Sequence, residues 1–186
     1  MNYDKFEPLL GDWGAHLRPF IESTECDKIY AKLKESSSKG LVICPNSADT
    51  YRAFKMTPFK RTKVVFLLQD LYPWVKNEVM VADGIALSCR DSAYLQPSLD
   101  KFYEAIENTQ PNGEELKKYR KSDLAHLCIQ GCMMLNTALT VEKDKPSSHS
   151  LLWRPFTKYL LEEVFGRFKE EVIFVLCGTE SHYFEK

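Results

Sequence analysis

Two apolar runs in this chain end in polar residues that could do chemistry together. The run 64–68 leads directly into Gln69 and Asp70, with Tyr72 two residues further on, and the run 132–135 leads into Asn136. A carboxylate can orient a water molecule, and a primary amide can pair with a ligand edge that presents one donor and one acceptor. The sequence therefore offers an acid, an amide and a ring to one site. On these residues alone, a polar loop after a strand remains an open alternative.

The elements that must position these residues follow from the apolar pattern. A third apolar run, 172–177, ends in Gly178 and Thr179, and helical patterns alternate with the runs from residue 64 onward. This alternation is typical of a parallel sheet layered between helices. We predict an α/β fold, a three-layer α/β/α sandwich, in which the carboxyl ends of the strands border one crevice.

The bulk composition sets limits on size and partners. With 186 residues, of which 44% are hydrophobic, the chain can form one domain that spans residues 1–186. The net charge of −1 excludes a uniformly basic coat for nucleic acid, but it allows a local basic cleft. No apolar stretch approaches the ~20 residues that span a bilayer, so we expect no membrane association.

The six cysteines indicate a reducing compartment. They contain no Cys-x-x-Cys pair, and no secretory signal precedes them, so we expect free thiols and a cytoplasmic or, in a eukaryote, nuclear protein. His126, Cys128 and Cys132 could in principle hold zinc or an iron-sulfur cluster. We predict neither a metal nor a cofactor. Metal analysis would test the alternative of a metal-dependent hydrolase.

Local signals predict several element boundaries. We expect a helix capped by Thr24, a brief extended segment over 83–88, and a helix that begins at Pro97 with Ser98 as its N-cap. We also expect a long helix after residue 150 that ends at Gly166.

Read together, the polar segments resemble the uracil-DNA glycosylases, and the matches occur in the family's order. They are Leu-Gln-Asp-Leu-Tyr-Pro (68–73) for the family's Gly-Gln-Asp-Pro-Tyr-His, Gly-Ile-Ala-Leu-Ser (84–88) for Gly-Leu-Cys-Phe-Ser, Gln-Pro-Ser-Leu (96–99) for the proline-rich loop, Met-Leu-Asn-Thr-Ala-Leu-Thr-Val (134–141) for Leu-Leu-Asn-x-x-Leu-Thr-Val, and Gly178-Thr179 for a Gly-Ser turn. Ser148-His149 and Trp153 follow at the family's spacing.

This resemblance implies a role for each residue of the site. Asp70 would face the positively charged sugar of the transition state and orient the attacking water, and Asn136 would pair with the edge of uracil. Tyr72 would fill the space that a thymine methyl needs, and Gln69 would present its backbone to the base. Leu87 stands where the family has a Phe that stacks on uracil, so weaker base binding is expected.

The resemblance also implies how DNA is held. Ser98, Gly178 and Thr179 would grip the phosphates and help to flip the nucleotide out of single- or double-stranded DNA. The expected protein is a monomer that works without a cofactor and leaves an abasic site.

Two departures affect that expectation. Pro73 replaces a His of the family, and the chain stops at Lys186 before the family's last strand and its His-Pro-Ser-Pro-Leu-Ser segment. We therefore expect an exposed sheet edge beside the run 172–177, which a partner could cover. The alternative is a catalytically impaired glycosylase-like module that binds DNA or a protein.

Overall fold

A three-stranded parallel sheet lies at the centre of the computed structural model, which describes residues 2–92, 94–168 and 170–185. Its strands are β5 (Cys132–Asn136), β2 (Val64–Leu68) and β7 (Ile173–Leu176), in that order across the sheet. β2 pairs with both neighbours in parallel, so the three carboxyl ends lie at one edge. The predicted parallel sheet is confirmed.

Helices cover both faces of this sheet. Val65 and Phe174 stand side by side in the ladder, and the ring of Phe174 meets that of Phe165 edge to face, with 5.3 Å between the ring centroids. Phe66 points to the opposite face, because successive side chains alternate along a strand. There its ring lies 5.6 Å from that of Phe102 in α5. The predicted α/β/α layering is confirmed.

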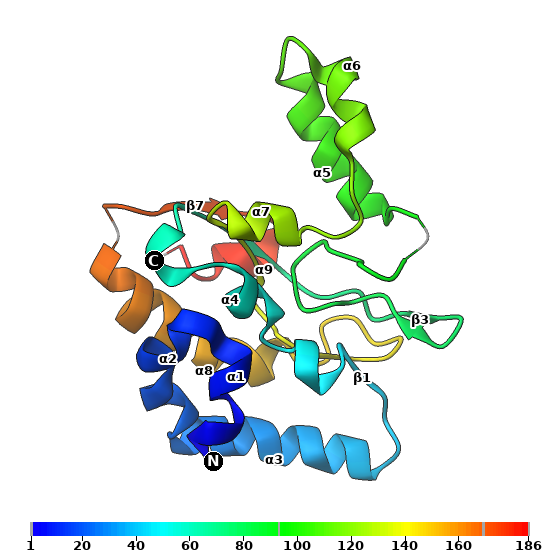
Figure 1. Ribbon diagram of the computed structural model, residues 1–186. Coiled ribbons are helices and arrows are strands. Elements are labelled where there is room, and N and C mark those ends of the chain that lie inside the picture. The colour runs from blue at the N-terminus through cyan, green and yellow to red at the C-terminus, as the bar shows by residue number, and fades with distance from the viewer. Residues whose placement is uncertain (1, 93, 169, 186) are drawn as a thin grey trace.

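The helices frame the sheet and supply most of the core. They are α1 (Glu7–Leu10), α2 (Gly14–Ile21), α3 (Thr24–Ser38), α4 (Arg52–Met56), α5 (Pro97–Asn108), α6 (Gly113–Leu116), α7 (Ala125–Ile129), α8 (Ser150–Tyr159) and α9 (Thr179–His182). Short 3-10 turns are η1 (Tyr3–Lys5), η2 (Gly11–Trp13), η3 (Ser47–Asp49), η4 (Phe59–Arg61), η5 (Lys117–Tyr119) and η7 (Phe165–Phe168), and η6 (Leu160–Val164) is a π-helical turn. α5 and α6 project from the body of the molecule (Figure 1).

Two small antiparallel ribbons complete the fold. β1 (Ile43–Cys44) pairs with β6 (Val141–Glu142), which ties the segment after β5 to the N-terminal helices. β3 (Val75–Lys76) and β4 (Val79–Met80) form a hairpin with two turn residues. In the part of the chain that the structure describes, no helix has the length and apolar character to cross a membrane.

Several boundary predictions were wrong. Gln96, not Ser98, is the N-cap of α5, because Pro97 takes the first helical position, where a missing N–H costs nothing. Ser23, not Thr24, caps α3, since Ser23 keeps an extended backbone and its hydroxyl accepts from the N–H of Cys26 at 3.3 Å.

Two further segments differ from prediction. The segment 83–88 forms turns instead of an extended segment, and Leu87 in it has a φ of +62°. The regular α-helix after residue 150 ends at Tyr159, and tighter and wider turns carry the chain past Gly166 to Phe168.

Candidate functional site

The ends of β2 and β5 bring together the segments that carry Asp70 and Asn136. Asn136 stands opposite Leu68 in the parallel ladder. Beyond that pair, the N–H of Thr137 donates to the carbonyl of Leu68 at 2.8 Å, and the Thr137 hydroxyl donates to the carbonyl of Gln69 at 2.7 Å. The chain that leads to Asp70 is thereby fixed to the residue after Asn136.

Asn136 presents a buried amide at this edge. Its side chain is 5% exposed, and within the described ranges its Oδ1 has no hydrogen-bond partner. A buried carbonyl oxygen without a partner is costly, so such a group in a folded protein commonly awaits a ligand or a water molecule. By strand alternation Asn136 shares the face of Phe66, which is the face covered by α5.

The Asp70 carboxylate is held from a distant part of the chain. Its Oδ2 accepts a hydrogen bond from the backbone N–H of Ser147. The hydroxyl of the same serine accepts from Nε2 of Gln69 at 3.1 Å. Ser147 has a φ of +62°, a backbone conformation that costs a non-glycine residue free energy. One residue in an unfavourable conformation therefore fixes two neighbouring side chains of the site.

Tyr72 joins three of the predicted site residues. Its hydroxyl donates to the carbonyl of Leu87 at 3.2 Å and lies 2.9 Å from the hydroxyl of Ser98 in the first turn of α5. Burial raises the pKa of Tyr72 to about 12, so the hydroxyl stays protonated at neutral pH. The ring stacks against Trp74, with 5.7 Å between centroids and an interplanar angle of 27°. The Tyr72 hydroxyl thus contacts both Leu87 and Ser98.

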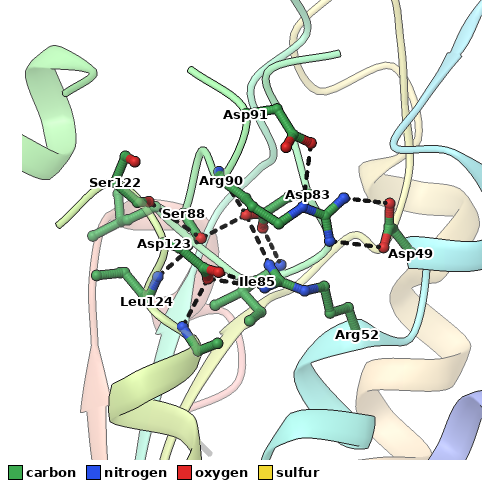
Figure 2. A network of polar contacts seen from close by, with 12 residues as sticks. Asp49, Arg52, Asp83, Ile85, Ser88, Arg90, Asp91, Ser122, Asp123 and Leu124 are labelled. Atoms are coloured by element: carbon green, nitrogen blue, oxygen red, sulfur yellow. Dashed lines mark hydrogen bonds and ion pairs between the residues drawn. The ribbon is translucent and has the colours of Figure 1, made fainter. Parts of the chain in front are cut away.

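A buried ionic network fixes the turn that carries Leu87 (Figure 2). The guanidinium of Arg52 in α4 lies 2.8 Å from the carboxylate of Asp83 and 2.9 Å from that of Asp123. Asp83 also accepts from the Ser88 hydroxyl at 2.6 Å and from the N–H of Arg90 at 2.9 Å. Asp83 at the start of the turn therefore holds the residues that follow Leu87 at its end.

The turn also packs too closely against η3 and the first residue of α4 to admit a side chain at its start. Gly84 has a φ of +85°, and a Cβ there would lie 1.8 Å from the carbonyl oxygen of Asp49. The N–H of Ala86 donates to the carbonyl of Met134 in β5 at 3.0 Å. The position of Leu87 is consequently set both by α4 and by the sheet.

Comparisons with known proteins decide the family. A uracil-DNA glycosylase of Neisseria gonorrhoeae is 33% identical over 181 residues, which cover 94% of this chain and 74% of that protein. The chain belongs to the uracil-DNA glycosylase family. A second relative, the uracil-DNA glycosylase of Proteus mirabilis, is 33% identical over 155 residues, and the match spans 83% of this chain and 65% of that protein. A scan against protein-family models found no match.

Solved structures of uracil-DNA glycosylases show the same fold. The crystal structure of mimivirus uracil-DNA glycosylase superposes with a TM-score of 0.77 over 98% of this chain and 72% of that chain, at 20% identity. A structure from Nitratifractor salsuginis has a TM-score of 0.52 at 14% identity and covers 96% of this chain. At these identities the likeness concerns the fold.

The third strand end of this glycosylase-family chain is an exposed turn. The N–H of Cys177 donates to the carbonyl of Leu67 at 2.9 Å, so Gly178 and Thr179 follow directly at the edge that carries Asp70 and Asn136. Gly178 has a φ of +89°, with open space where a Cβ would stand. Both residues are exposed, which leaves their backbone donors accessible to solvent.

Sequence reasoning missed two residues of the site. Ser147 lies 77 residues from Asp70, and no local signal links the two. No role is predicted for Trp74 from the sequence, although its ring stacks on that of Tyr72. Of the candidate metal ligands His126, Cys128 and Cys132, the two cysteines are free thiols. Cys128 is buried and Cys132 is half-buried. Across the described residues, no group of three or more His, Cys, Asp and Glu side chains could hold a metal ion.

Proposed function

We propose that this chain hydrolyses the bond between uracil and deoxyribose in DNA. The observation that carries the proposal is the register of β2 and β5, which sets the buried amide of Asn136 opposite Leu68, two residues before Asp70. Uracil presents an N–H between two carbonyl oxygens. The unsatisfied Oδ1 of Asn136 can accept from that N–H, while its NH₂ group donates to a neighbouring carbonyl.

Discrimination against other bases follows from the same groups. Cytosine presents an acceptor where uracil presents the N–H, so an amide that neighbours lock in one orientation would leave itself and cytosine with unpaired buried groups. Thymine carries a methyl group that the proposed position of Tyr72 excludes. The hydrogen bonds of the Tyr72 hydroxyl with Leu87 and Ser98 support this role, because they hold the tyrosine ring in place.

Asp70 is the proposed catalytic group. Its carboxylate would face the sugar, which gains positive charge as the bond breaks, and would orient the attacking water. Gln69 would present its backbone to the base, and Leu87 would border the base without an aromatic stack. Ser98, Gly178 and Thr179 would contact the DNA phosphates on either side of the flipped nucleotide.

The proposed protein acts as a monomer inside the cell, on single- or double-stranded DNA. The name uracil-DNA glycosylase applies to the whole relative. The match spans 65% of the length of the Proteus protein, so the activity of this chain is part of the proposal. The second candidate is a glycosylase-like module that binds DNA without efficient chemistry. Uracil release separates the two.

The test compares uracil release from a single-stranded oligonucleotide by the wild type, Asp70→Asn and Asn136→Ala. We expect Asp70→Asn to lower the rate by about 10²- to 10³-fold, as expected for loss of a preorganised electrostatic group. Asp4→Asn is the matched control, because Asp4 is exposed in η1. Equal rates for wild type and Asp70→Asn would remove Asp70 from the mechanism. DNA binding without any release by the wild type would favour the binding module.

A further inference from the structure

We infer that Trp74, with Lys76 two residues further on and the Tyr94 ring that Lys76 contacts, forms a stacking surface for an unpaired base of the same DNA strand, outside the uracil site. This inference rests on the proposed function, because it requires a DNA strand at Tyr72. It assigns an added DNA contact to the β3–β4 hairpin.

The first observation is the exposure of Trp74 next to the site. One face of its ring covers Tyr72, and the side chain is nevertheless 42% exposed. A base that follows the flipped nucleotide along the strand would find this ring on the outer side of Tyr72. Every base has an aromatic face, so stacking on such a platform does not depend on sequence.

The second observation is that the backbone holds the platform in place. The carbonyl of Trp74 accepts from the N–H of Val81 at 3.0 Å, which extends the β3–β4 pairing by one step. The carbonyl of Pro73 accepts from the N–H of Asp144 at 2.8 Å, which ties the platform to the segment after β6. A rigid aromatic loses little conformational entropy when a ligand stacks on it.

The third observation is a positive charge on a second exposed ring, carried by the hairpin strand that follows Trp74. Nζ of Lys76 lies 4.7 Å from the centroid of the Tyr94 ring and also contacts the Tyr94 hydroxyl. Tyr94 is 53% exposed. The carboxylate of the hairpin, Glu78, lies in the turn, at the opposite end from Trp74. Lysine among exposed aromatics is the combination that binds the phosphates and bases of single strands.

Tryptophan fluorescence can test this inference, because only one of the three tryptophans is exposed. The chain has three tryptophans, and Trp13 and Trp153 are 0% exposed, so quenching of tryptophan fluorescence by a ligand reports on Trp74. The probe is oligothymidylate, which contains no uracil. We expect saturable quenching by this probe in the wild type and none in Trp74→Phe. We expect Trp74→Ala to bind it roughly 5- to 100-fold more weakly, the loss of one stacked base.

The control is an exposed tyrosine with its own lysine elsewhere on the surface. Tyr119 is 61% exposed, and Nζ of Lys118 lies 5.1 Å from its ring centroid. Tyr119→Ala should bind oligothymidylate as the wild type does, and thermal unfolding of each variant establishes that it is folded. Lys76→Gln should reduce the salt dependence of binding by about one phosphate contact.

The outcomes separate this inference from the proposed function. Oligothymidylate that binds without changing the fluorescence of Trp74, or that binds Trp74→Ala as tightly as the wild type, overturns the inference even if uracil is released. Quenching that is lost in Trp74→Phe supports the inference even if the protein releases no uracil. A failure of the wild type to bind oligothymidylate at all also overturns it.

Discussion

Ser147 donates its backbone N–H to the carboxylate of Asp70, 77 residues away in sequence. The same residue accepts from the side chain of Gln69 through its hydroxyl. The carboxylate of Asp70 and the amide of Gln69 are therefore held by one residue. The segment between β6 and α8 therefore belongs to the site, although its sequence is that of an ordinary polar loop.

Substitution of Ser147 should separate its two contributions. Ser147→Gly keeps the N–H to Asp70 and relieves the unfavourable φ. Ser147→Ala keeps the unfavourable φ. Both variants lose the contact to Gln69. We expect the glycine variant to be more stable than the alanine variant by about 1 kcal/mol in urea unfolding. Uracil release should fall by the same modest factor in both. Equal stability would mean that the backbone at this position relaxes.

Arg52 should be more important for stability than any exposed arginine of the same network. Arg52→Met leaves the buried carboxylate of Asp83 without its cation, and we expect a loss of roughly 3 kcal/mol. Arg90→Met is the control, because its ion pairs with Asp49 and Asp91 are partly exposed, and it should cost under about 1 kcal/mol. Urea unfolding measures both. Similar losses would contradict the assignment of the buried pair as the anchor of the turn.

His149 should make stability depend on pH in mildly acidic solution. Burial lowers the pKa of its imidazole below the ordinary 6.5, although Glu142 at 3.9 Å acts in the opposite direction. The unfolded chain then binds a proton more readily than the folded one, so this contribution is complete above about pH 6.5 and is lost as the pH falls toward the folded-state pKa. His149→Gln should flatten the dependence of urea unfolding on pH in that window. An unchanged slope would contradict the prediction.

The aromatic ring absent at position 87 should be recoverable. Leu87 is half-buried beside Tyr72, and Leu87→Phe should stack on a bound base, with a gain of about 1 to 3 kcal/mol. Inhibition of the glycosylase reaction by free uracil measures the gain. Leu151→Phe, at an exposed position on α8, serves as the control and should leave inhibition unchanged. Weaker inhibition in Leu87→Phe would mean that this side chain does not border the base.

The sheet could be predicted, and the candidate site residues could be proposed, because their signals are local. The apolar runs of β2 and β5 end where periodicity places them, and the residues that follow are adjacent in sequence. The rule that parallel strands share one carboxyl edge then brings Asp70 near Asn136 without further information.

What could not be predicted depends on contacts between distant segments. The sequence of the turn that carries Leu87 is typical of an extended segment. In the structure the Asp83 carboxylate accepts hydrogen bonds from backbone N–H groups of this turn, and Arg52 in α4 neutralises that carboxylate. The sequence favours Ser98 as a cap because serine prefers that position, yet its hydroxyl lies in hydrogen-bond contact with the hydroxyl of Tyr72. In each case the partner comes from another part of the chain.

The central place of β2 has a consequence for how activity would be lost. The strand is paired on both sides. Its pairing therefore fixes the relative positions of Asp70 after β2, Asn136 at the end of β5 and the Gly178 turn after β7. A slip of one residue in this pairing would turn the Asn136 side chain to the other face of the sheet. The proposed recognition of the base and the proposed attack on the sugar would then be lost together, while the proposed phosphate contact of Ser98 in α5 would persist.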